Sequence, residues 1–109
     1  MPRFIVTGRY TGAAFKGMIA NPSDREAAAR GLIEAGGGKL ESFYMTTGAT
    51  DFIFTAVIDE AADLLAGLMA AAAAGAISDV RTQRAFTAAE FMAIQKKAGT
   101  LASGYKAPS

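Results

Sequence analysis

Asp51 is the residue of this chain best placed for acid–base chemistry, because it stands beside an expected turn and at the start of an aromatic, apolar segment. An apolar surround formed by Phe43, Met45 and Phe52 would favour uptake of a proton by its carboxylate, as a general base requires. The alternative is a structural role, in which a carboxylate at a turn accepts hydrogen bonds from backbone N–H groups. Both interpretations stay open from the sequence alone.

Two tyrosines, each with an apolar ring and a polar hydroxyl, are candidates to line a pocket. Tyr44 alternates with Ser42 and Thr46 on one face of its expected strand, which forms a semi-polar stripe. Tyr10 ends the first expected strand. In the alternative interpretation both rings pack at the margin of the core, with their hydroxyl groups in water.

Arg9 lies in the segment Gly8–Gly12, which leads from an expected strand into a short helix. With Lys16 nearby, this helix start could hold a carboxylate or a phosphate. The alternative is that Gly8 and Gly12 only serve the geometry of the strand and the turn.

Several classes of site are excluded because the chain has no cysteine, no histidine and no tryptophan. Thiolate nucleophiles, Ser-His-Asp triads, zinc fingers and haem held by imidazole are ruled out. No two carboxylates have the spacing of a metal site, so we expect neither a metal nor another cofactor. Eleven basic residues oppose ten acidic ones, so no electrostatic attraction to nucleic acid is expected.

No membrane association is expected either. The longest apolar segment, residues 64–77, is too short to span a bilayer and is rich in alanine. The first residues have no signal-peptide pattern, and we expect a cytoplasmic protein.

Hydrophobic periodicity and turn residues predict eight elements in the 109 residues, few enough for one domain. The expected strands are 4–10, 39–46, 51–58 and 77–86, and the expected helices are 13–19, 23–35, 59–75 and 87–97. Capping boxes at Ser23–Glu26 and Thr87–Glu90 mark two of the helix starts, and Asp59 is the expected cap of a third. Residues 1–98 are predicted to form the domain and 99–109 a tail.

The order of these elements predicts an α+β fold, the ferredoxin-like βαββαβ arrangement of a four-stranded antiparallel sheet, with an added C-terminal helix. In it the first and third strands are central and the fourth is an edge strand. Both central strands are apolar on both faces, whereas the connecting helices cover only one. We therefore expect an open face with several aromatic and β-branched side chains, covered by a second copy packed sheet to sheet as a homodimer or higher oligomer. The alternative cover is the chain's own C-terminal helix.

The segment Phe43–Phe52 resembles the signature of the GYD domain family, and Phe4–Thr11 and Val80–Phe91 are similar to other parts of it. Gly48 and Asp51 match the motif, while Thr50 stands at the position of its tyrosine. The resemblance implies a protein of the dimeric α/β-barrel type. It implies little about function, because fold relatives include small monooxygenases, haem-degrading enzymes, muconolactone-isomerase-like enzymes and ligand-sensing domains.

Two functions remain open. The first is a non-catalytic homo-oligomer that binds a small molecule or serves as an accessory module. Its candidate ligand-binding residues are Arg9, Tyr10, Tyr44, Thr46, Gly48, Thr50 and Asp51. The alternative is a small cofactor-independent isomerase or monooxygenase, with Asp51 as the base, Tyr44 or Tyr10 as the positioning group and Arg9 as the charge partner.

Overall fold

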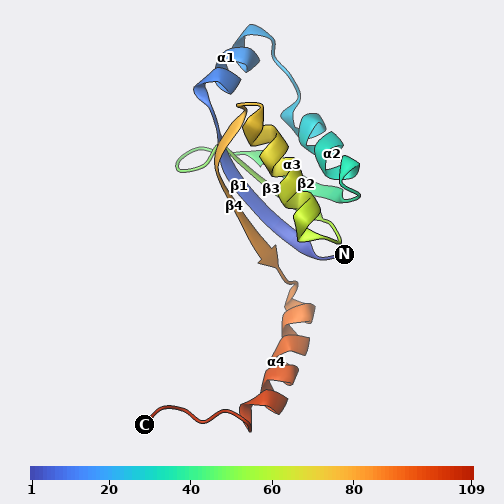
Figure 1. Cartoon of the computed structure of the whole chain (residues 1–109), viewed down its shortest axis with the longest axis vertical. Helices are drawn as coiled ribbons and strands as arrows, with labels where there is room; N and C mark the ends of the chain where they lie inside the picture. Colours follow the sequence, from blue (N-terminus) through green and yellow to red (C-terminus); the bar gives the residue numbers. More distant parts are fainter.

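The computed structural model describes all 109 residues and contains a four-stranded antiparallel sheet with four helices (Figure 1). The elements are β1 (Arg3–Tyr10), α1 (Gly12–Ala20), α2 (Arg25–Ala35), β2 (Lys39–Met45), β3 (Phe52–Val57), α3 (Ala61–Ala73), β4 (Ile77–Ala85) and α4 (Ala88–Ala102). The strand order is β2-β3-β1-β4. This is an α+β fold consistent with the ferredoxin-like arrangement, and it confirms that β1 and β3 are central and that β4 lies at an edge.

The helix starts agree with the predictions in one case and differ in two. The capping box of α4 is present, with Thr87 Oγ1 accepting from the Glu90 N–H at 3.1 Å and Glu90 Oε1 accepting from the Thr87 N–H at 2.8 Å. In α2 the cap is Asp24 and not Ser23, because the Asp24 carboxylate accepts from the first turn and is the better partner for a helix N-terminus. In α3 the cap position falls at Glu60 and not Asp59, and no side chain caps it.

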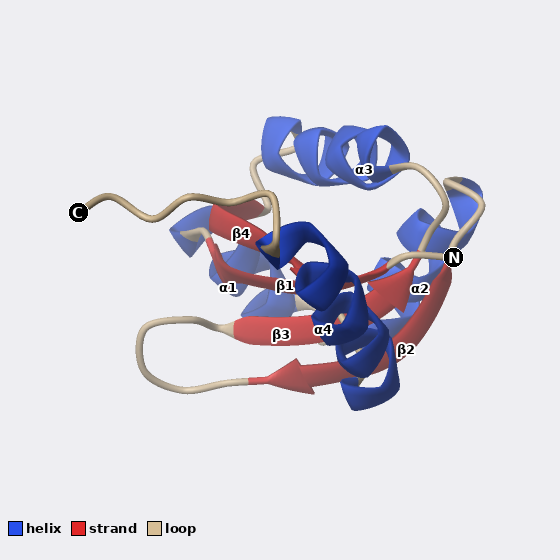
Figure 2. Ribbon diagram, turned by 90° about the horizontal axis from the view of Figure 1, so that it is seen from below, coloured by secondary structure: helices blue, strands red, loops and turns tan.

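Helices α2 and α3 both lie on one side of the sheet, as Figure 2 shows from below. On that side the phenylalanine rings form a layer. The rings of Phe43, Phe52 and Phe54 lie 6.2 to 6.3 Å apart and within 15° of parallel. The core that this layer forms with the helices contains Val6, Tyr10, Ile33, Leu40, Phe52, Phe54, Ala56, Ile58, Leu64 and Leu68.

The opposite side of the sheet has no helix of the same chain over it. Strand pairing places Ile5 opposite Thr55, Thr7 opposite Ile53, and Ile53 opposite Tyr44. Apart from Tyr44, the open face therefore presents β-branched and polar side chains and not the several aromatic ones expected. The physical reason is the strict alternation of the strands, which turns every phenylalanine of β1 and β3 toward the helices.

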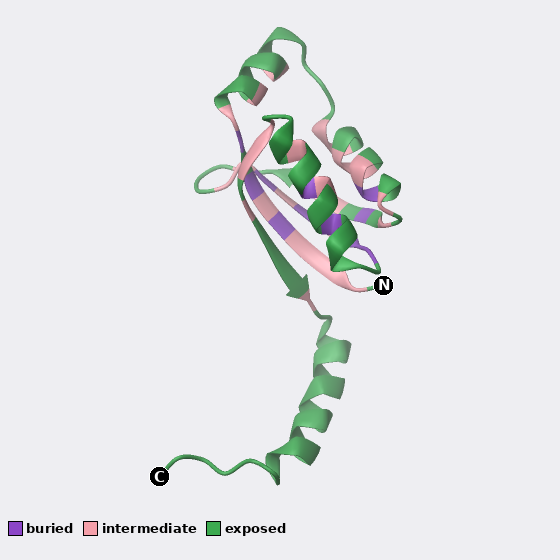
Figure 3. Cartoon of the chain, viewed as in Figure 1, coloured by how far each residue is buried: buried purple, intermediate pink, exposed green.

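Helix α4 projects beyond the end of the sheet and makes the molecule 60 Å long (Figure 1). Every residue from Phe86 to Ser109 is exposed (Figure 3). The C-terminal helix does not fold back over its own sheet, so that alternative is wrong for this structure. It also ends at Ala102 and not near residue 97, because residues 98–102 contain no proline and only one glycine to stop it. No helix of the structure is long and apolar enough to cross a membrane.

Gly8 makes the aromatic layer possible, because the Phe52 ring lies over the backbone at this position. A Cβ atom added at Gly8 would stand 2.5 Å from Cζ of Phe52, closer than carbon atoms can approach. At Gly12, by contrast, an added Cβ would meet no atom within 4 Å. A methyl group at Gly8 is therefore expected to lower the free energy of unfolding, whereas one at Gly12 is not.

We predict that Gly8→Ala lowers the free energy of unfolding by about 1–3 kcal/mol, the usual cost of overpacking a core. The matched Gly12→Ala change, at the start of α1, should leave stability unchanged or raise it by less than about 1 kcal/mol through better helix propensity. Urea unfolding followed by circular dichroism measures both. Equal unfolding midpoints for the two variants would contradict the packing of Phe52 on Gly8.

Candidate functional site

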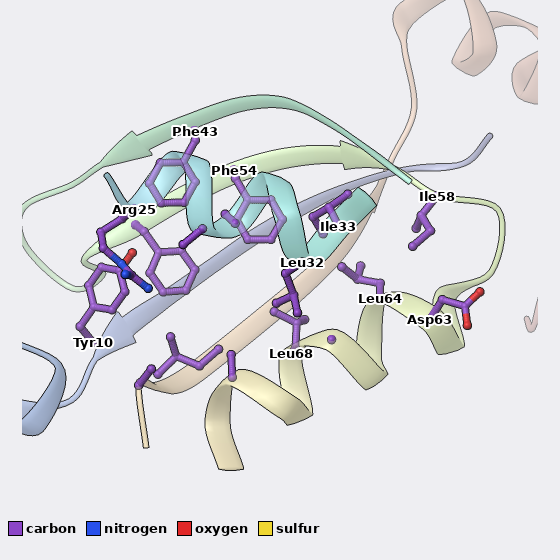
Figure 4. Close-up of a pocket in the computed structure, with 17 residues that line it drawn as sticks. Tyr10, Arg25, Leu32, Ile33, Phe43, Phe54, Ile58, Asp63, Leu64 and Leu68 are labelled. Atoms are coloured by element: carbon purple, nitrogen blue, oxygen red, sulfur yellow. The ribbon is translucent and has the colours of Figure 1, made fainter. Parts of the chain in front are cut away.

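A cavity of about 90 Å³ lies between the phenylalanine layer and helices α2 and α3 (Figure 4). Of its 17 lining residues, 14 are hydrophobic. Phe43, Phe52 and Phe54 line it from the sheet, and Leu64 and Leu68 line it from α3. The site is therefore an apolar chamber inside the domain.

The chamber exists because the helices present small residues to large aromatic rings. Ala28 and Ala29 of α2 and Ala71 of α3 line it without filling it. Gly67 allows the two helices to approach each other, since a Cβ atom there would stand 3.3 Å from Cγ of Leu32. The small side chains of α3 therefore also leave this space.

Two charged residues line the chamber, and Figure 4 shows them at its opposite ends. Asp63 stands in the first turn of α3. Arg25 stands at the start of α2, where its Nη1 donates to Ser23 Oγ at 3.2 Å. The Nε atom of Arg25 is buried and has no hydrogen-bond partner, the only such side-chain nitrogen or oxygen in the structure. A buried, unused N–H donor at the end of an apolar chamber is a position that favours an acceptor.

Tyr10 is buried beside Arg25, with 8% of its surface exposed. Its ring centroid lies 5.2 Å from that of Phe52 and 5.9 Å from that of Phe15. Burial raises the pKa of its hydroxyl above the ordinary value, and hydrogen bonding to the Arg25 side chain together with the positive charge of Arg25 offsets part of this rise. The negative charge of Asp51 adds a smaller upward contribution to the pKa. At neutral pH the Tyr10 hydroxyl is therefore protonated.

Asp51 joins the β2–β3 hairpin to the end of β1. Its Oδ2 accepts from the Tyr10 backbone N–H at 2.9 Å, and its own N–H donates to the Gly8 carbonyl at 2.8 Å. Its carbonyl accepts from the Thr46 N–H at 2.9 Å. This geometry supports the structural interpretation of Asp51, as a turn carboxylate engaged by backbone N–H.

Four other predicted residues gather around the same hairpin turn. Thr46 Oγ1 lies 2.9 Å from Thr50 Oγ1 and donates to the Thr50 carbonyl at 2.7 Å. Gly48 has a φ of 90°, which glycine adopts without strain. The exposed Arg9 donates from Nη1 to the Ala49 carbonyl at 3.5 Å. Their ligand-binding role stays a prediction.

The family model of the GYD domain matches residues 4–94 of the chain. The chain belongs to the GYD domain family. The comparisons with curated proteins and with solved structures gave no match. The motif of this GYD domain, from Gly48 to Asp51, forms the hairpin turn just described, and in it the Thr50 hydroxyl bonds to Thr46.

Of the residues predicted for the site of this GYD domain, only Tyr10 lines the chamber. Tyr44 lies on the open face of the sheet with 67% of its surface exposed. The sequence analysis did not predict Arg25 as a site residue. It included Arg25 only as a residue within the Ser23–Glu26 capping box. The available signal was its helical spacing to Ala28, Ala29 and Leu32, which places an arginine on the apolar face of α2.

A second hollow, open and of about 310 Å³, lies on the outer side of Arg25. It is lined by α1 and by the connection to α2, and it shares Arg25 and Ala76 with the chamber. Arg25 thus lies between the apolar chamber and a more polar hollow that is more open to solvent. No group of three or more acidic side chains able to hold a metal ion is present.

We predict that Tyr10 ionises above the usual tyrosine pKa of about 10, and that Arg25→Gln moves its pKa further up because the guanidinium no longer favours the phenolate. As the pH rises, the Tyr10 hydroxyl loses its proton at a lower pH in the unfolded chain than in the folded one. Its contribution to the free energy of unfolding is therefore complete below about pH 10 and falls as the pH rises through the folded pKa. Ultraviolet titration, with Tyr10→Phe subtracted, measures the shift. A Tyr10 pKa that Arg25→Gln leaves unchanged would contradict the contact.

Proposed function

We propose that this GYD domain binds a small, mainly apolar molecule that has one anionic group. The observation that supports this most directly is the buried Nε of Arg25, which has no partner and stands at the end of an apolar chamber. The apolar part of the molecule would contact the phenylalanine layer, and the anionic group would accept hydrogen bonds from Arg25.

The charge of the ligand follows from the chemistry of Arg25. A guanidinium has N–H donors only, and leaving one of them buried and unpaired costs free energy. A carboxylate would accept from Nε and from a neighbouring nitrogen in the paired geometry that arginine favours. Asp63 at the far end of the chamber repels an anion there, so the anionic group is expected at the Arg25 end.

The size of the ligand follows from the volume. A chamber of 90 Å³ is well below the usual range of ligand pockets, which starts near about 300 Å³. A single aromatic ring or a short branched chain is therefore the expected apolar part. A larger polar remainder would extend past Arg25 into the open hollow beside α1.

The catalytic alternative has less support from the geometry. Asp51, its proposed base, accepts a hydrogen bond from the Tyr10 backbone and does not line the chamber. Tyr44, its proposed positioning group, lies on the open face of the sheet. Neither group lines the chamber, so a binding role is the better proposal.

We predict that benzoate binds the protein and that benzyl alcohol, with a ring of the same size and no charge, binds more weakly. Arg25→Gln should reduce the affinity for benzoate about 10- to 100-fold, the worth of a hydrogen bond to a charged group, with little effect on benzyl alcohol. The matched control is Arg30→Gln on the same helix, whose guanidinium pairs with Glu26 at 3.0 Å outside the chamber. Isothermal titration calorimetry measures the affinity of the original protein and of both variants for each of the two ligands.

Equal losses in Arg25→Gln and Arg30→Gln would contradict a specific anion site, because both remove one positive charge from α2. A second variant, Ala71→Leu, fills the chamber from α3 and should abolish the binding of both ring compounds. Binding that survives Ala71→Leu would place the ligand elsewhere. Native mass spectrometry of the purified protein reports any molecule that it retains from the cell.

A further inference from the structure

Helix α4 has an apolar stripe that nothing in its own chain covers. Phe91, Ile94, Ala98 and Leu101 follow one another at spacings of three, four and three residues, which places them on one side of the helix. The three large side chains are 40 to 65% exposed. A single exposed apolar side chain is ordinary, but a continuous stripe along a 15-residue helix indicates a partner.

The start of α4 holds this helix away from its own domain. Only Phe86 and Thr87 separate the end of β4 from the first residue of α4. The capping box of Thr87 and Glu90 fixes the first turn, and a Glu90 carboxylate oxygen lies 4.0 Å from Arg3 Nη1 at the start of β1. In this structure the short connection directs α4 away from the sheet that precedes it.

The chain exposes more surface than a compact monomer, and the excess can be compared with the area that a dimer buries. The chain exposes 7357 Å², whereas a compact monomer of its mass exposes about 5,700 Å². Its radius of gyration is 17.7 Å, against about 13 Å for a compact chain of this length. The excess of about 1,700 Å² falls within the roughly 1,000–2,500 Å² that each subunit of an obligate homodimer buries. A second copy is therefore an occupant of adequate size.

The open face of the sheet is a surface that matches the stripe. Ile5 and Ile53 provide its apolar side chains on the two middle strands, where they pair with Thr55 and Thr7. A helix of 15 residues is about 22 Å long, close to the roughly 20 Å of a six-residue strand such as β3. Each chain has both the stripe and the open face. Two copies related by a two-fold axis can therefore form two equivalent contacts, each between the stripe of one copy and the open face of the other.

We propose that α4 of each copy packs its apolar stripe across the open sheet face of a second copy, forming a dimer by reciprocal exchange of this helix. The arrangement differs from direct sheet-to-sheet packing, because the contacts are made by a helix that lies outside the four-stranded unit. The dimer does not depend on ligand binding in the chamber, which lies on the opposite side of the sheet.

The decisive variant is Ile94→Glu combined with Leu101→Glu, which places two charges in the stripe. Its matched control is Thr100→Glu, also exposed and outside the stripe on the same helix. Sedimentation equilibrium of the full-length protein should give a dimer for the original protein and for Thr100→Glu. The double variant should be monomeric, with the dimer dissociation constant raised at least about 30-fold, as for the loss of interface anchors. Because α4 projects away from the domain, the double variant should keep the circular dichroism of a folded protein.

Cysteine cross-linking tests which surface receives the helix, and the absence of native cysteine makes it specific. A copy with Ile94→Cys mixed with a copy with Ile53→Cys, on the open face, should form a disulfide-linked pair under mild oxidation. The control pairs Ile94→Cys with Leu65→Cys, which is exposed on α3, and should not. Preferential linking to position 65 would overturn the assignment of the open face. A monomeric original protein, or a dimer that persists in the double glutamate variant, would overturn the exchange of α4.

Discussion

The layer of aromatic rings on one face of the sheet is the interaction on which the rest of this structure depends. The rings of Phe43, Phe52 and Phe54 stack side by side, and Tyr10 continues the layer beside Phe52. The layer needs the missing side chain of Gly8, because the Phe52 ring occupies the space that a Cβ atom would take. The helices present small residues to the large rings. Because these small side chains do not fill the space between helices and rings, the chamber remains.

The same layer explains why the molecule has two unlike faces. All the phenylalanines of the central strands point to the helices, so the other face keeps only β-branched and polar side chains with Tyr44. One face therefore encloses a space suited to a small molecule, with Arg25 as the charged group at its end. The other face is left for a partner, and α4 extends the apolar surface that such a partner would contact. In the two proposals made above, the ligand and the second copy therefore contact opposite faces of one sheet.

Much of the fold could be predicted from the sequence, because its determinants are local. The alternation of Phe52, Phe54 and Ala56 with Ile53 and Thr55 defines β3 and its two faces without any tertiary information. The capping box at Thr87 and Glu90 likewise predicts the start of α4. The end of α4 was harder to place, because small residues after Lys97 are compatible with either a helix or a tail.

The site was less predictable, because it depends on which elements meet. The sequence places Asp51 beside a turn but cannot show that the Tyr10 N–H, some forty residues away, donates to its carboxylate. Arg25 is one of several arginines in the sequence, and its importance appears only when α2 packs over the phenylalanine layer. Tyr10, one of the predicted pocket residues, is among those that line the chamber, since it ends a central strand beside α2.

The central claim is that the chamber under α2 and α3 receives an apolar anion, and methyl NMR tests it most directly. With the methyl groups of Ile33, Leu64 and Leu68 labelled, the account predicts that benzoate shifts these chamber signals and leaves those of Ile94 and Leu101 on α4 unchanged. Chamber signals that do not move at saturating benzoate, or shifts confined to the surface of α4, would contradict it.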